Sequence, residues 1–300
     1  MADRPRASTA AAEPTASADP AREDGSAEVD RSTREEPHLP RVTESLARAL
    51  RTVGSSPLLL TVAFLSLLST WGLFASLGVE GDPRFLALLM AISPAHLFFT
   101  DGSVALFGGS PVAALGSLAG LAALRAVTFT LLILLIEGTR RSEISGRRIA
   151  GRLPRAAATF ATLYLGEVVL VVVLSAVLPA VLGQFSVVVI PAAIYFLALA
   201  PVVVTVEGVS IREGLVRGVR AVRLPRTGHL GLALGYFVFL YLAAAISPFG
   251  PLSPATPTLL AWAFALLMTF LHVSVLGTLV LRWAAVRDQV AGSGESRGRR

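Results

Sequence analysis

The chain has 300 residues, of which 54% are hydrophobic and only 15% are charged, against about 25% in an average soluble domain. This composition excludes a disordered chain, a collagen-like chain and an ordinary soluble enzyme. Cysteine is absent, which excludes disulfide bonds, thiolate nucleophiles and thiolate metal ligands. The formal net charge is +6, and every basic side chain is arginine.

Charge is distributed unevenly along the chain. Residues 1–40 carry nine acidic and five arginine side chains, a net charge of −4, with very few large aliphatic residues. Such a segment cannot bury enough apolar surface to offset its ordering entropy, so we predict a disordered tail over 1–40. A second disordered and basic tail is predicted over 288–300. The remaining arginines are spread over short loops between apolar segments, a pattern that does not indicate nucleic-acid binding.

An amphipathic helix is predicted over 41–54, directly before the first long apolar segment. Its apolar residues recur at helical spacing on one stripe: Val42, Leu46, Leu50 and Val53. Arg48 and Arg51 lie off that stripe. Such a helix lies in the headgroup layer, where its arginines face anionic lipid. An ordinary surface helix packed on a bundle would have the same pattern, and the two interpretations are compatible.

Long apolar segments between 55 and 287 predict a bundle of membrane-spanning helices. The hydrocarbon core, about 30 Å thick, is crossed by roughly 20 helical residues. Six segments are suitable, namely 57–79, 111–136, 156–182, 185–206, 230–246 and 258–283. A further apolar segment, 85–108, is interrupted by Pro94 and Asp101 and ends in glycines, so we predict a re-entrant element there and keep a seventh span as the alternative.

Arginine also predicts the orientation. It is concentrated in four places: before the first span, after 136, after 206 and after 283. Arginine-rich loops are typical of the cytoplasmic side of a membrane. If all four regions are cytoplasmic, the number of spans is even and both termini are cytoplasmic. The sequence therefore predicts an all-α, polytopic helical bundle in the cell membrane, with six transmembrane helices.

A second interfacial helix is predicted after the fourth span, which ends at Glu207. Ser210 followed by Glu213 is the signature of a capping box, which starts a helix. The predicted apolar stripe is Ile211, Leu215, Val219 and Val222, and the opposite, cationic face is Arg212, Arg217, Arg220 and Arg223. We expect this helix to lie along the inner leaflet.

The same region carries a family resemblance. Glu207-Gly208, followed by Glu213-Gly214-Leu215-Val216-Arg217, resembles the motif of a membrane-domain superfamily found fused to some glycerophosphodiester phosphodiesterases and also in stand-alone proteins. The resemblance covers roughly 41–290, with glycine at 218 where serine is expected. It implies a multi-pass membrane fold more than an activity, because no long polar region remains for a phosphodiesterase barrel.

Three ionisable side chains fall near the middle of predicted spans: Arg125, Glu167 and His272. A charged side chain at this depth costs about 2.5–3.5 kcal/mol on insertion scales. Arg125 and Glu167 lie at similar depth on consecutive antiparallel spans, so we predict that they pair, with His272 in the same polar network. The pair either fixes helix register or lines a polar cavity or ion path.

No catalytic motif and no metal-ligand or cofactor-binding spacing is present in the sequence. We therefore expect a non-enzymatic membrane scaffold, accessory or transport-related protein without a cofactor, whose partner is the lipid bilayer with its anionic headgroups. A transporter or channel using the polar layer is the alternative. An intramembrane lipid-processing enzyme is a second alternative. The sequence indicates no particular protein partner.

Overall fold

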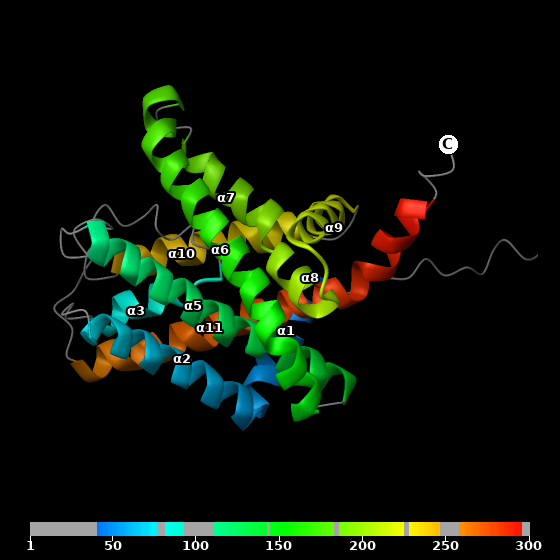
Figure 1. Cartoon of the computed structure of the whole chain (residues 1–300), viewed down its shortest axis with the longest axis horizontal. Coiled ribbons are helices and arrows are strands. Elements are labelled where there is room, and N and C mark those ends of the chain that lie inside the picture. The colour runs from blue at the N-terminus through cyan, green and yellow to red at the C-terminus, as the bar shows by residue number, and fades with distance from the viewer. Residues whose placement is uncertain are drawn as a thin grey trace, which may run out of the picture. The chain divides into compact units, whose positions relative to one another are not determined.

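The computed structural model describes most of the chain beyond residue 40. The described ranges are 41–76, 82–92, 111–142, 145–182, 186–224, 228–246 and 258–295. The chain divides into two compact units, Met1–His38 and Leu39–Arg300, and every described helix belongs to the second (Figure 1). The tail predicted over 1–40 lies outside the described residues, apart from its boundary with Arg41.

Regular structure in the described ranges is entirely helical, which confirms the all-α class. The helices are α1 (Val42–Ser55), α2 (Pro57–Ser76), α3 (Pro83–Leu89), α5 (Pro111–Arg141), α6 (Gly146–Leu182), α7 (Ser186–Leu197), α8 (Ala200–Glu207), α9 (Ile211–Arg223), α10 (His229–Ile246) and α11 (Thr258–Glu295). Four of the described helices, α2, α5, α10 and α11, are long and apolar enough to cross a membrane.

Three predicted boundaries need correction. The fourth predicted span, 185–206, is divided into α7 and α8, because Pro201 has no N–H to donate to the carbonyl of Leu197. The helix that contains the third predicted span, 156–182, begins ten residues before it, at Gly146, and is continuous over 37 residues. The predicted tail over 288–300 continues α11 as a helix as far as Glu295. Val290 in it is buried on the same side of the helix as Val286, one turn earlier. Residues 296–300 lie outside the described ranges.

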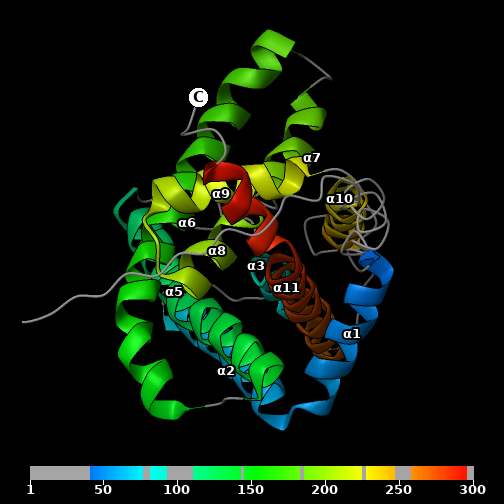
Figure 2. The ribbon, with the colours of Figure 1, turned by 90° about the vertical axis from the view of Figure 1, so that its right-hand side faces the viewer.

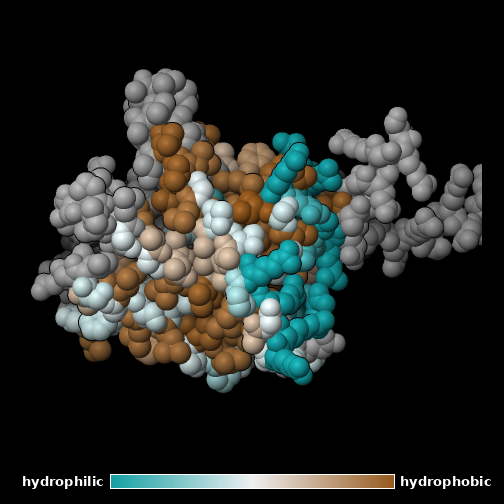
Figure 3. Space-filling view, viewed as in Figure 1, coloured by the Kyte–Doolittle hydropathy of each residue, from teal (hydrophilic) through white to brown (hydrophobic). Residues whose placement is uncertain are grey.

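The arginine-bearing ends of the helices meet at one end of the bundle. α1 packs along α11 (Figure 2), and α9 contacts α7, α8 and α11. Arg152 at the start of α6 contacts the end of α8, and Gly228 before α10 lies against Val42 of α1. Figure 3 shows hydrophilic residues gathered toward this end, with hydrophobic residues over much of the remaining surface in that view.

α1 packs on α11 through its smallest residues. Ser45, Ala49 and Val53 are buried, whereas Leu46 and Leu50 are only half-buried. A side chain on Gly277 of α11 would meet the Cβ atom of Ala49 at 3.2 Å, so the two helices approach closely. The predicted apolar stripe is therefore only partly the packing face, because the contact uses small residues one position before the large ones.

α9 packs against α8 in the same way. Its buried residues are Gly214, Gly218, Ala221 and Val222. A Cβ atom on Gly214 would meet Cγ2 of Val204 at 2.4 Å, and one on Gly218 would meet the backbone nitrogen of Ala200 at 3.3 Å. Only glycine allows this distance. The predicted stripe residues Ile211, Leu215 and Val219 are half-buried beside the contact.

α3 enters the bundle from the opposite end. Arg84 donates to the carbonyl of Ile246 at the end of α10, and the N–H of Ile92 donates to the hydroxyl of Tyr236, ten residues earlier in α10. Met90 and Ile92 are buried. With seven residues, α3 is only about 10 Å long. Residues 82–92 therefore run into the bundle, and the rest of the predicted re-entrant element, residues 93–108, lies outside the described ranges.

We expect Gly214→Ala to destabilise the protein by about 1–3 kcal/mol, because Val204 is buried and cannot move away from the added methyl group. Gly231→Ala in α10 is the matched control, because a Cβ atom there meets nothing within 4 Å. The control should be neutral or stabilising by up to about 1 kcal/mol. Thermal unfolding in detergent checks both, and equal effects at the two sites would contradict the close α8–α9 contact.

The ion pair between Asp82 and Arg84 predicts a pH dependence of stability. Burial by itself raises the pKa of Asp82, but hydrogen bonds and the charge of Arg84 outweigh it and bring the pKa below the ordinary value of 3.8. The stabilisation is therefore complete above pH 3.8 and is lost as the pH falls through the folded-state pKa. The unfolding temperature of Asp82→Asn should lie below that of the wild type at pH 6, and the gap should close in acid. A gap independent of pH would contradict this.

Candidate functional site

Arg125 lies at the centre of the bundle, on α5. Its side chain is fully buried (0% exposed). Nη1 lies 2.6 Å from Sδ of Met90, Nη2 lies 3.5 Å from the hydroxyl of Thr70, and the guanidinium lies 5.5 Å from the ring centroid of Phe129. Nε has no hydrogen-bond partner among the described residues. The charge is therefore solvated by a hydroxyl, a thioether and an aromatic face, which are weak partners compared with a carboxylate.

A second polar group surrounds His272 of α11. The hydroxyl of Tyr236 accepts from the N–H of Ile92 at 3.0 Å and lies 2.9 Å from Nδ1 of His272. The phenol group therefore joins the backbone of Ile92 to the imidazole of His272. Phe239 packs edge-on against the imidazole, with ring centroids 5.3 Å apart. The histidine is thus held by α10 and by the segment that follows α3.

Residues 90–92 connect the two groups. Met90 contacts Arg125 through its side chain, and Ile92, two residues later, bonds Tyr236 through its backbone. The short inward segment therefore brings Arg125 and His272 into one polar cluster, formed by α2, α5, α10, α11 and residues 90–92. Tyr236 is one of four tyrosines that the sequence offers as hydrogen-bond partners, whereas neither Met90 nor the Ile92 backbone has a sequence signature.

Glu167 does not belong to this cluster, which corrects the predicted pairing. No ion pair or hydrogen bond joins it to Arg125 in the described part of the chain, and its buried Oε1 has no hydrogen-bond partner there. The guanidinium of Arg125 is directed toward α2 and residue 90, whereas Glu167 lies on α6. Equal depth in neighbouring helices does not determine which faces meet.

The α8–α9 turn forms an ionic cluster. Arg217 bonds the carboxylates of Glu207 and Glu213, and burial, which lowers its pKa, is outweighed by these two partners, which raise it. The hydroxyl of Ser210 accepts from the N–H of Glu213 at 3.3 Å, which confirms the predicted helix start. Gly208 ends α8 with φ +70°, a conformation that favours glycine.

The predicted cationic face of α9 is thus divided. Arg217 is consumed by the two glutamates, and Arg223 stacks over the ring of Phe196 at 5.9 Å from its centroid. Arg212 and Arg220 are exposed and form no ion pair with any described residue. Only these two arginines of the face are fully available to an external anion.

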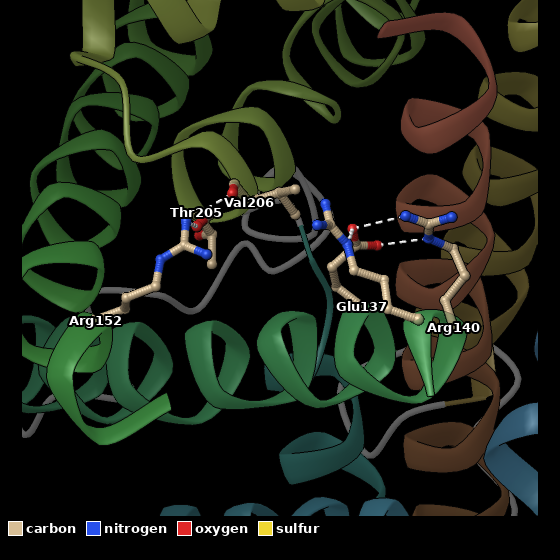
Figure 4. Close-up of polar contacts among 6 residues, drawn as sticks. Glu137, Arg140, Arg152, Thr205 and Val206 are labelled. Atoms are coloured by element: carbon tan, nitrogen blue, oxygen red, sulfur yellow. Dashed lines mark hydrogen bonds and ion pairs between the residues drawn. The ribbon is translucent and has the colours of Figure 1, made fainter. Parts of the chain in front are cut away.

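Two further arginine contacts tie the same end together (Figure 4). Arg152 donates to the carbonyls of Val206, at 2.6 Å, and Thr205, at 3.3 Å, where α8 leaves them without intrahelical partners. Glu137, almost fully buried, accepts from Arg140 and Arg141 at 2.7 and 2.6 Å. At the end of α5, one carboxylate therefore binds two arginines, and at the α8–α9 turn one arginine binds two carboxylates.

Arg125 does not line the cavity between α1, α5 and α11, the one between α7, α10 and α11, or the one between α5 and α6. The first of these lies at the arginine-rich end and has a volume of about 500 Å³. No cluster of His, Asp and Glu among the described residues could hold a metal ion.

Comparisons of the chain with protein-family models, with curated proteins and with solved structures found no match. Function is therefore inferred from the residues and their geometry.

Double-mutant cycles can test whether Arg125 pairs with Glu167 and whether Tyr236 pairs with His272. Because Arg125 and Glu167 do not touch, the effects of Arg125→Met and Glu167→Gln on the free energy of unfolding should add within about 0.5 kcal/mol. Tyr236→Phe and His272→Phe remove the same hydrogen bond, so they should show a coupling of about 0.5–3 kcal/mol. Coupling between Arg125 and Glu167 above 1 kcal/mol would restore the predicted pair.

Proposed function

We propose that this chain is a non-enzymatic multi-pass membrane protein that acts as a scaffold or accessory protein at the cytoplasmic leaflet, where its arginine-rich end binds anionic lipid headgroups. In this proposal it has six spans and both termini are cytoplasmic. The observation that carries the proposal is the arrangement of faces on α1 and α9.

Each of these two helices has three kinds of surface. Small residues pack on the bundle, as Ala49 does in α1 and Gly218 in α9. Large aliphatic residues such as Leu50 and Leu215 stay half-buried beside that contact, and exposed arginines follow. A helix that only packs on a protein would bury its large apolar residues first. Half-buried leucines next to arginines suit the boundary between acyl chains and headgroups.

The directions of the helices support six spans. Three apolar helices, α2, α6 and α10, begin near the arginine-rich end. Three others, α5, α8 and α11, end there or pass it in their last turns. In the proposed topology α6 is a span whose first ten residues lie in the headgroup layer, and α7 with α8 forms one broken span. α2 then ends and α5 begins on the outer side, and α3 dips inward from that side.

The resemblance to the membrane domain of glycerophosphodiester phosphodiesterases is compatible with this proposal. Its motif residues Glu207, Glu213 and Arg217 form one ionic cluster, and Gly208 and Gly214 occupy positions where the backbone requires glycine or a very close contact. These contacts give the motif a structural role: they fix a helix at the membrane surface to the end of a span.

Transport is the second candidate function, and one observation favours it. Arg125 and Glu167 are buried at the depth of the bundle centre, and each has a side-chain atom without a partner among the described residues. Such groups are costly to keep unless they serve an ion or a substrate. In this proposal Arg125 would act after a rearrangement that opens the bundle, because its side chain is closed off.

The absence of cysteine in the chain allows a direct test of topology. The two variants are Arg220→Cys in α9 and Ser76→Cys at the end of α2. Both positions are exposed, and they lie at opposite ends of the bundle. In intact cells a membrane-impermeant maleimide should label position 76 at least tenfold faster than position 220, and permeabilisation should remove the difference. Faster labelling at 220 in intact cells would reverse the orientation and remove the basis for inner-leaflet binding.

A further inference from the structure

The cavity between α1, α5 and α11 combines net positive charge with one buried hydroxyl that has no hydrogen-bond partner among the described residues. It is lined on the α1 side by Ser45, Arg48 and Thr52, and on the α5 side by Thr139 and Arg140, with small residues of α11 behind them. Its volume of about 500 Å³ lies in the range of small-ligand sites, roughly 300–1,000 Å³. It lies alongside α1, whose arginines we place at the headgroup layer.

The charge of the site is positive after all internal pairs are counted. Arg140 is held by Glu137 through Nε and Nη2, at 2.7 and 2.9 Å, and the same glutamate also binds Arg141. These three side chains together leave one positive charge. Arg48 is exposed and forms no ion pair with any described residue, so it adds a second. A monovalent or divalent anion would balance this site.

Ser45 supplies an independent indication of a ligand. Its side chain is 3% exposed and lines the cavity, yet its hydroxyl has no hydrogen-bond partner among the described residues. A buried hydroxyl without a partner costs free energy that a bound acceptor would recover. The hydroxyls of Thr52 and Thr139 donate to their own helices, at 2.9 Å each, and can still accept.

We propose that this cavity binds the headgroup of an anionic phospholipid, with Arg48 and Arg140 on the phosphate and Ser45 donating to one of its oxygens. Phosphate suits arginine because its oxygens match the planar guanidinium donors. A lipid is favoured over free phosphate because α1 carries half-buried leucines beside the cavity, where acyl chains would continue. This inference rests on the proposed function and gives it one defined binding site.

The experiment is native mass spectrometry of the full chain in detergent, titrated with phosphatidylglycerol. One lipid should bind before the others, and phosphatidylcholine, whose headgroup carries no net charge, should bind there at least tenfold more weakly. Arg48→Gln should weaken the first binding step at least tenfold. Ser45→Ala should weaken it several-fold without lowering the unfolding temperature, because the hydroxyl has no partner among the described residues.

Arg51→Gln is the matched control. Arg51 is exposed on the same helix and carries the same charge, but it does not line the cavity. General attraction to anionic lipid predicts the same loss for both arginines, about fivefold each. A defined site predicts a loss for Arg48→Gln that is several times larger. Ala285→Trp, which fills the cavity from α11, should also abolish the first binding step while the protein stays folded.

Three results would overturn the proposal. Equal losses for Arg48→Gln and Arg51→Gln would mean diffuse attraction, and equal affinity for phosphatidylcholine would exclude charge recognition. Displacement of the lipid by millimolar inorganic phosphate would assign the cavity to free phosphate. A failure of the proposed function can be distinguished from a failure of this site. The cysteine labelling tests the orientation in the membrane, whereas the lipid titration in detergent gives the same result in either orientation.

Discussion

The high cost of placing an arginine in hydrocarbon is the constraint from which the arrangement follows. Most described arginines lie near helix ends or on the two amphipathic helices at one end of the bundle, whereas Arg84 lies at the opposite end. Arg125 and Arg282 are buried within α5 and α11, and Met90, in the segment after α3, contacts Arg125. The inward position of Met90 and the polar cluster are therefore linked, because the thioether is one of the few partners of the buried guanidinium.

Much of the fold follows from periodicity and charge. The sequence predicts α1, α2, α9 and α10 within a few residues, but α6 begins and α11 ends about ten residues beyond the predicted bounds. The start of α9 at Ser210 is confirmed by its hydrogen bond. The predicted packing faces of α1 and α9 are partly wrong, because the prediction ranks residues by hydrophobicity and so places leucine above alanine and glycine. Close helix contacts instead prefer small residues, and the spacing of Gly214 and Gly218, four apart, was an available signal.

The polar site was less predictable. Depth in the membrane places Arg125 and Glu167 at one level, but it carries no information about the direction in which each side chain points. The actual partners of Arg125 are a threonine and a methionine, residue types that occur in any apolar helix. The third contact that organises the cluster is a backbone N–H of residue 92, which every residue except proline possesses. Such partners emerge only from the three-dimensional arrangement.

The continuity of α11 has a mechanical consequence. Gly277, which lines the cavity beneath α1, is five residues from His272, so the two lie about 7.5 Å apart along the same rod. An unbroken helix turns as a unit over so short a length. Any occupant that rotates α11 at the cavity must also rotate the imidazole against Tyr236. The cavity and the interior of the bundle are thereby mechanically coupled through one helix.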